Sequence, residues 1–176
     1  PPCDSSSERW AGFADTFWYI DAMASKAANG YSAFCRQDFV GIDYAMLDCA
    51  TNDPLPDYYG GGLWSKLMGT GVVRAASSTA VRAYAHCHPT SQADLTVLLL
   101  NLEPDDGAAK PRKVVVGDAV AATEEYHLTG PSGTGAQSVA LNGVPLKASL
   151  DGVLPAMVGE AGDAASVALA PASIAF

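Results

Sequence analysis

The chain has 176 residues, a formal net charge of −9 and a sequence pI of about 4.5. This acidic balance argues against nucleic acid as a partner, because phosphate groups are bound mainly by lysine and arginine. Hydrophobic residues make up 49% of the chain, enough for a real core, and there is no apolar run of the roughly 18 residues that a membrane span needs. The chain begins Pro1-Pro2-Cys3 without a methionine, and we expect it to be a processed product or a fragment.

The four cysteines have no spacing that indicates a metal site. Cys3, Cys35, Cys49 and Cys87 form no CxxC pair, which is the spacing typical of structural zinc. We expect neither a metal nor a cofactor. Cys35 lies among residues typical of a strand, and we predict a buried, unreactive thiol there.

A helix is predicted over residues 9–28. Ser5 and Glu8 have the spacing of a capping box, and Asn29-Gly30 is a plausible stop. The apolar residues between them recur at helical spacing, which predicts packing of one wide face against a sheet; they are Trp10, Phe13, Phe17, Trp18, Ile20, Met23 and Ala27.

The next segment has the pattern of a strand, a long loop and a second helix. Residues 31–37 are predicted to form a mostly buried strand that ends in Arg36-Gln37. Residues 38–56 form a polar loop, and a helix over 57–69 begins at Asp57 as N-cap. A strand that opens into such a loop is typical of β/α-barrels, in which polar groups at the carboxyl ends of strands line the active site.

After residue 69 the apolar pattern changes from helical spacing to alternation. Asn142-Gly143 predicts a tight hairpin turn. Many short strands with regular turn signals indicate a β-sandwich and a domain boundary near residue 70. The Ala-rich segments 119–122 and 161–172 are interpreted as loops. Strands are predicted at 72–73, 81–87, 95–100, 113–116, 124–128, 138–141, 144–146 and 173–176.

Nine short motifs occur in the same order as in a known family. They are FWYID at 17–21, CRQ at 35–37, DY at 43–44, PLPDYY at 54–59, LWSKLMG at 63–69, RAYAHC at 82–87, LLLNL at 98–102, EYHLT at 125–129 and LNG at 141–143. No single motif is decisive, but the ordered set is specific. From about residue 10 onward the chain resembles the C-terminal portion of heparanases and plant heparanase-like proteins, glycoside hydrolase family 79.

The resemblance implies a fold of mixed class, α/β followed by all-β. Residues 1–69 would be the last βα units of a (β/α)8 barrel, and residues 70–176 an antiparallel β-sandwich. It also implies a retaining endo-β-glucuronidase that acts on acidic glycans, with two glutamates as acid/base and nucleophile. Neither glutamate of the family maps onto this sequence, so no catalytic residue is expected in this chain.

The resemblance places part of the substrate rim in this chain. Gln37 matches a family position that hydrogen-bonds the sugar, and Tyr44 matches one that contacts the uronic acid together with backbone N–H groups of a nearby glycine. We expect Gly41 to fill the glycine role, in a turn that here reads Gly41-Ile42, and Arg36 to lie in the same rim.

The expected partners are a glycan or proteoglycan that contains glucuronic acid and the N-terminal barrel portion of the same protein. With Arg36 as the main basic residue of the rim, we expect a less sulfated glucuronide, such as a plant- or alga-type glycan. Family context favours a secreted, lysosomal or vacuolar, or membrane-associated extracellular location. The alternative left open is a non-catalytic carbohydrate-binding or interaction module built on the sandwich.

Overall fold

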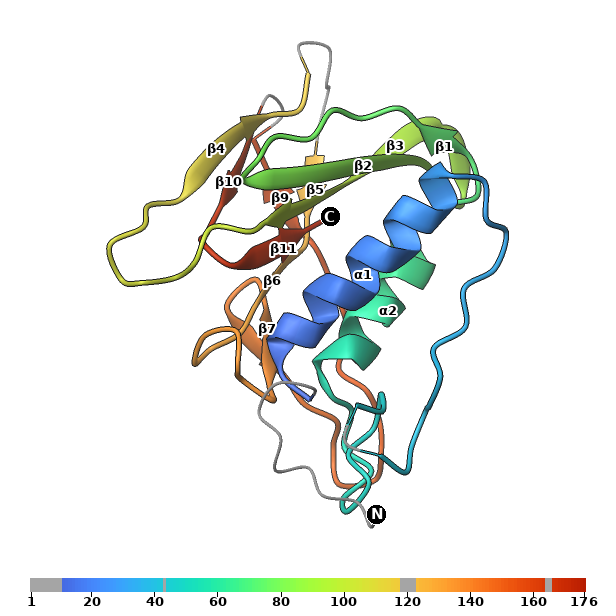
Figure 1. The fold of residues 1–176 in the computed structure, drawn as a ribbon, viewed down its shortest axis with the longest axis vertical. Coiled ribbons are helices and arrows are strands. Elements are labelled where there is room, and N and C mark those ends of the chain that lie inside the picture. The colour runs from blue at the N-terminus through green and yellow to red at the C-terminus, as the bar shows by residue number, and fades with distance from the viewer. Residues whose placement is uncertain (1–10, 43, 118–122, 164–165) are drawn as a thin grey trace.

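The computed structural model of the chain describes residues 11–42, 44–117, 123–163 and 166–176, which form two helices and eleven strands (Figure 1). Seven strands build one antiparallel sheet in the order β1-β2-β3-β11-β6-β7-β8. Their bounds are β1 (Val72–Val73), β2 (Val81–His88), β3 (Ser91–Asn101), β6 (His127–Thr129), β7 (Val139–Leu141), β8 (Val144–Leu146) and β11 (Ser173–Ala175). Each lies in or next to a segment that the alternation predicts.

Alternate side chains of the central strands feed two separate cores, because successive residues of a strand point to opposite faces. In β3, Leu98 and Leu100 join the core on one face, whereas Leu99 lies in the core on the other. In β11, Ile174 and Ala175 divide in the same way. The sheet is therefore covered on both faces.

The two helices cover one face of this sheet (Figure 1). They are α1 (Phe13–Ala28) and α2 (Pro56–Leu67), and both confirm the predicted helices. Phe13, Ile20 and Leu63 are fully buried between the helices and the sheet. Asp57 does not cap α2, because Leu55 is the N-cap and Pro56 occupies the first turn. The fixed φ of proline already suits that position, so the N-cap lies two residues earlier than predicted.

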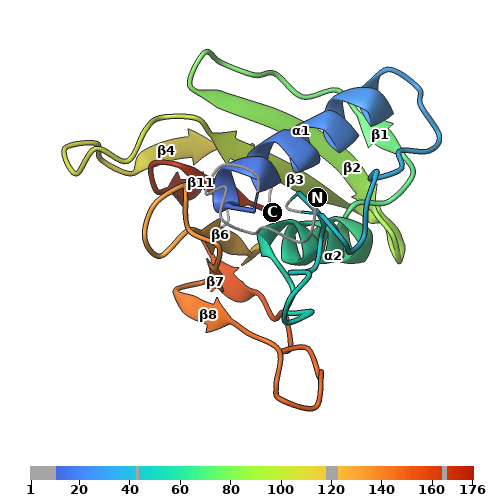
Figure 2. The same cartoon turned by 60° about the horizontal axis from the view of Figure 1, so that its bottom comes forward.

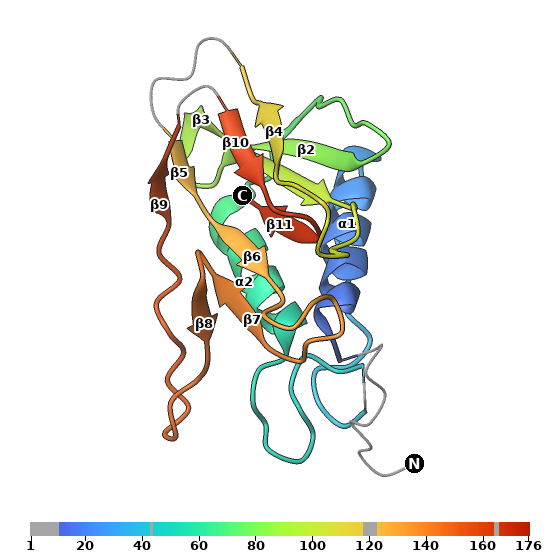
Figure 3. The ribbon, with the colours of Figure 1, turned by 90° about the vertical axis from the view of Figure 1, so that its left-hand side faces the viewer.

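A two-stranded ribbon covers the opposite face (Figure 3). It pairs β4 (Arg112–Val115) with β10 (Ser166–Leu169), and Val167 and Leu169 pack against Val81 and Leu99 of the large sheet. A second ribbon pairs β5 (Thr123–Glu125) with β9 (Glu160–Gly162). This arrangement is compatible with the predicted sandwich, whereas the barrel assignment of residues 1–69 and the boundary near residue 70 stay predictions.

Three local predictions are wrong. Residues 31–37 are irregular rather than a strand, because no described segment pairs with their backbone, and most of them are exposed. Cys35 is accordingly exposed and not buried. The Ala-rich segment 161–172 contains β10 and part of β9, since pairing with β4 and β5 outweighs the weak strand preference of alanine.

Some predictions fall outside the described residues: the capping box of Ser5 and Glu8, Cys3 and the loop at 119–122. The first helix begins later than the predicted residue 9, because Gly12 is its N-cap and has an extended backbone. Within the described part of the chain, no helix is long and apolar enough to cross a membrane.

Candidate functional site

The N-termini of both helices and the later part of the segment between them lie at one end of the molecule, which Figure 2 turns towards the viewer; that segment begins at the opposite end of α1 (Figure 1). The loop is held by its own backbone hydrogen bonds. Leu47 N–H donates to the carbonyl of Phe39 at 3.0 Å, and Leu55 N–H donates to the carbonyl of Met46 at 3.0 Å. The predicted substrate rim therefore lies at the end of the molecule that is formed by the N-termini of α1 and α2 and by this loop.

Arg36 joins these three parts. Its Nη2 lies 2.6 Å from Asp15 Oδ2, in the first turn of α1, and 2.7 Å from Asp57 Oδ2, in the first turn of α2. The same nitrogen donates to the backbone carbonyl of Tyr44, in the loop, at 2.8 Å. We call Asp15, Arg36 and Asp57 the Arg36 clasp.

The Arg36 clasp is shielded from solvent. The side chain of Arg36 is 9% exposed, and those of Asp15 and Asp57 are 7% and 4% exposed. The guanidinium also lies 5.1 Å from the ring centre of Trp18 and 5.3 Å from that of Tyr19, within the range of cation–π attraction. Its Nε has no hydrogen-bond partner.

One positive charge faces two buried carboxylates in the clasp, and the pKa of Asp57 is raised. Burial and the neighbouring Asp15 raise the pKa of Asp57 to about 7, against the opposing effects of Arg36 and of the Thr16 hydroxyl, which donates to Asp57 Oδ1 at 2.9 Å. Burial, followed by the charge of Asp57, also raises the pKa of Tyr19. Asp57 is therefore about half protonated near pH 7.

The structure brings two of the four predicted rim residues together, Arg36 and Tyr44, through the Tyr44 carbonyl. Tyr44 is half-buried, and Gln37 is exposed directly after Arg36. Gly41 is exposed at φ 115°, a conformation that favours glycine, with open space where a side chain would stand. Their contacts with a sugar stay predictions.

Sequence reasoning missed the partners of Arg36. Asp15 and Asp57 each lie 21 residues from Arg36 along the chain, on opposite sides. The available signal was an acidic residue in the first turn of each helix, because such positions gather at one end when two helices pack side by side and point in the same direction, as α1 and α2 do (Figure 1).

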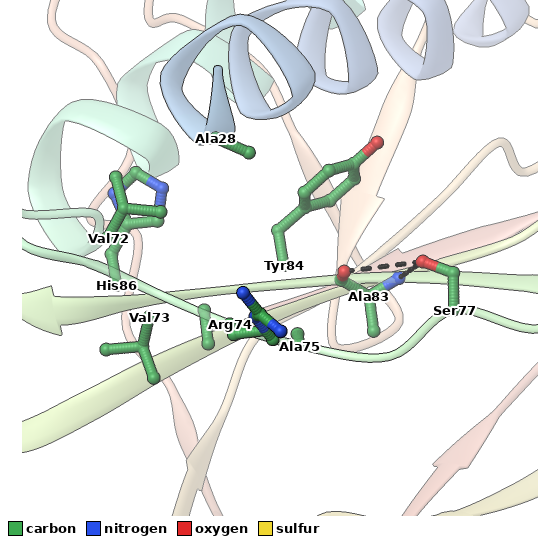
Figure 4. A pocket seen from close by; sticks show the side chains of 10 residues that line it. Ala28, Val72, Val73, Arg74, Ala75, Ser77, Ala83, Tyr84 and His86 are labelled. Atoms are coloured by element: carbon green, nitrogen blue, oxygen red, sulfur yellow. Dashed lines mark hydrogen bonds between the residues drawn. The ribbon is translucent and has the colours of Figure 1, made fainter. Parts of the chain in front are cut away.

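A cavity of about 300 Å³ lies at the other end of α1, between Ala28 and the β1–β2 edge (Figure 4). Tyr84 lines it and donates to Asp21 Oδ1 at 2.7 Å; burial and this bond raise its pKa to about 12. His86 Nδ1 is bonded to the carbonyl of Gly69 at 2.6 Å. None of the described lining residues is a carboxylate, so this cavity lacks the acid pair of a glycosidase.

Among the described residues, no group of three or more His, Cys, Asp or Glu side chains could hold a metal ion.

No protein-family model matches the chain. Curated relatives do. The chain is 31% identical to heparanase-like protein 1 of Arabidopsis thaliana over 177 aligned positions, which cover 82% of this chain and 32% of that protein. It is 36% identical over 150 positions to baicalin-beta-D-glucuronidase of Scutellaria baicalensis, covering 82% and 28%. With heparanase of Mus musculus the identity is 34% over 172 positions, covering 91% and 31%.

The chain thus spans about a third of the length of these relatives. They include both plant and animal proteins, and each aligns over four fifths or more of this chain. The chain belongs to the heparanase-like proteins of glycoside hydrolase family 79.

Proposed function

We propose that this chain is part of a retaining glycoside hydrolase that cleaves glucuronide linkages in an acidic glycan. The chain contributes substrate-binding residues, and the catalytic glutamate pair lies outside these 176 residues. The names of two relatives, heparanase and baicalin-beta-D-glucuronidase, support the hydrolase class, and the second names a glucuronide.

The observation that carries the proposal is the position of the rim. Gln37, Gly41 and Tyr44 lie in or beside the loop at the helix N-terminal end of the molecule. In α/β enzymes this end adjoins the carboxyl ends of the strands, where substrates bind. A side-chain amide, a phenol and a backbone N–H suit sugar hydroxyls and a uronate carboxylate.

Arg36 supports this rim from inside. Two carboxylates already engage its guanidinium, so the uronate would be recognised by the neutral groups around it. This arrangement fits a substrate with few sulfates, because it leaves no spare cation in the Arg36 clasp.

The geometry of Asp15 and Asp57 supports a catalytic pair that lies outside this chain. Retaining hydrolysis needs two carboxyl groups about 5–5.5 Å apart and accessible to the sugar. Asp15 and Asp57 come close to each other, but both are buried and bonded to Arg36, so neither can attack a substrate.

The remainder of the same protein is proposed to cover the outer side of α1 and of residues 31–40. Trp18, Tyr31 and Phe39 are 54%, 64% and 56% exposed there. Residues 31–37 also have no strand partner among the described residues, and neighbouring strands of a (β/α)8 barrel would supply one. The protein is proposed to act outside the cell, in a lysosome or vacuole, or at a membrane surface.

The test is hydrolysis by the full-length protein of a chromogenic β-glucuronide and of the matching β-glucoside. We expect the glucuronide to be cleaved with retention. Gln37→Ala and Tyr44→Phe should each raise KM roughly 5- to 10-fold, as expected for one lost hydrogen bond to a charged or polar ligand. Gln92→Ala, an exposed position on β3, is the matched control and should not change KM.

Cleavage of both substrates at equal rates would contradict uronate recognition. Absence of hydrolysis, combined with retained binding of acidic glycans, would favour the carbohydrate-binding module instead.

A further inference from the structure

Three acceptors compete for one nitrogen of Arg36. Asp15 Oδ2, Asp57 Oδ2 and the Tyr44 carbonyl lie 2.6, 2.7 and 2.8 Å from Nη2. A guanidinium Nη carries only two hydrogens, so three full hydrogen bonds cannot form at once. Which two acceptors prevail depends on their charge, because an anionic carboxylate attracts a guanidinium hydrogen more strongly than a neutral carbonyl does.

The proton on Asp57 decides the competition. When Asp57 is ionised, two carboxylates take both hydrogens, and the Tyr44 carbonyl is the weakest competitor. When Asp57 is protonated, it is a neutral acid that hydrogen-bonds Asp15. Nη2 can then give one hydrogen to Asp15 and the other to Tyr44.

We propose that Asp57 and Asp15 are positioning residues of the substrate rim, which hold or release the backbone at Tyr44 through Arg36 according to whether Asp57 carries a proton. This inference rests on the proposed function for its effect on substrate. Its structural part, an exchange of partners at Arg36, stands on the three distances at Nη2 and on the raised pKa of Asp57, and it needs no substrate.

The groups that face Asp57 come from α1 and from the segment that carries Arg36. From α1 they are Asp15, the Thr16 hydroxyl and Tyr19, and from the segment before the loop Arg36. Arg36 stays charged throughout the physiological range. The raised pKa of Tyr19 keeps that phenol neutral there.

Release of the Tyr44 carbonyl removes a bond that ties the loop to Arg36, and two backbone bonds within the loop lie close to it. Ala45 N–H donates to Ile42 at 3.1 Å, and Leu47 N–H donates to Phe39 at 3.0 Å. These two amides therefore report on whether the rim is held. A held rim is preorganised for substrate, and preorganisation appears in KM.

The experiment measures KM and kcat of the full-length protein for a chromogenic β-glucuronide between about pH 5.5 and about pH 8.5. For the wild type we expect KM to rise about 5-fold across this range through loss of the bond from Arg36 to the Tyr44 carbonyl. Asp57→Asn mimics the protonated acid, and Asp15→Asn removes the competing carboxylate. In both variants KM should stay low and lose this rise, with kcat little changed.

Arg36→Lys should keep KM high at every pH, because one ammonium cannot serve these acceptors in the planar geometry of a guanidinium. Asp21→Asn is the control. Asp21 lies on the same helix as Asp15 and pairs with Arg82. Its replacement changes the charge of α1 without touching the clasp, so the wild-type dependence of KM on pH should remain.

Hydrogen exchange of the Ala45 and Leu47 amides, compared between wild type and Asp57→Asn at equal pH, gives a readout without substrate. We expect these amides to exchange faster in the wild type than in Asp57→Asn, and only above about pH 7. If Asp57 had a merely structural role, the two proteins would differ by the same factor at every pH. Superimposable exchange and KM profiles of the two proteins would overturn the proposal. Lack of glucuronide hydrolysis with the expected exchange difference would instead refute the proposed function alone.

Discussion

Asparagine in place of Asp57 is expected to remove a pH-dependent loss of stability. In the folded chain burial and Asp15 raise the pKa of Asp57 to about 7 from an ordinary value of 3.8. The folded state therefore binds more protons than the unfolded state between these values, so the free energy of unfolding falls as pH rises from about 4 to about 7. Each unit corresponds to about 1.4 kcal/mol, and the interval to roughly 4 kcal/mol.

The assay is urea unfolding of the full-length wild type, Asp57→Asn and Asp21→Asn at a series of pH values. The free energy of unfolding of Asp57→Asn minus that of the wild type should increase by roughly 4 kcal/mol from pH 4 to pH 7 and stay level above. Asp21 pairs with a half-exposed Arg82, so its variant should show no such increase. A difference curve for Asp57→Asn that is flat, or that slopes the other way, would refute the assignment of the extra proton to Asp57.

Two further predictions concern packing. Gly162→Ala should lower the free energy of unfolding by about 1–2 kcal/mol, because the new Cβ would stand 2.5 Å from Glu125 Cγ and the Glu125 carboxylate is held by His127 Nε2 at 2.7 Å. Gly135→Ala, with no atom within 4 Å, is its control in thermal melting and should be neutral. Leu98→Ala should lose about 2–5 kcal/mol, since Leu98 is fully buried, whereas Leu95→Ala, 56% exposed on the same strand, should change stability by under about 0.5 kcal/mol in urea.

Elements with a local signal were predictable from the sequence. The spacing of Phe13 and Ile20 places one face of α1 in the core, as observed. Asn142 and Gly143 have φ values of 49° and 77°, as a tight hairpin turn with two positive φ angles requires, and they join β7 to β8 as predicted. In each case neighbouring residues alone carry the information.

Elements that depend on a distant partner were not predictable. Residues 31–37 have the composition of a strand, but a strand exists only where another strand accepts its hydrogen bonds, and none of the described segments does so. The reverse holds for β10, where alanine-rich residues form a strand because β4 lies beside them. Apolar composition predicts that a segment can pair, not whether it does.

The candidate site shows the same limit for a charged residue. Arg36 was assigned to the rim because it precedes Gln37, and the structure keeps it at that end while directing its guanidinium inward to Asp15 and Asp57. The residues near Arg36 in the sequence do not indicate that it pairs with Asp15 and Asp57. These two carboxylates meet only after the two helices have packed side by side. The location of Arg36 thus follows from its neighbours in the sequence, whereas its partners follow from tertiary packing.

The placement of these carboxylates in the first turns of α1 and α2 explains how the fold tolerates their burial. A helix N-terminus carries a partial positive charge that favours a nearby anion, so each carboxylate is stabilised by its own helix as well as by Arg36. Two helix ends and one guanidinium are still insufficient for two buried negative charges, as the proton affinity of Asp57 shows. Burial of Asp57 and the neighbouring charge of Asp15 cost stability at high pH. Since Arg36 also holds the Tyr44 carbonyl, the same two effects can couple a single proton to the shape of the rim.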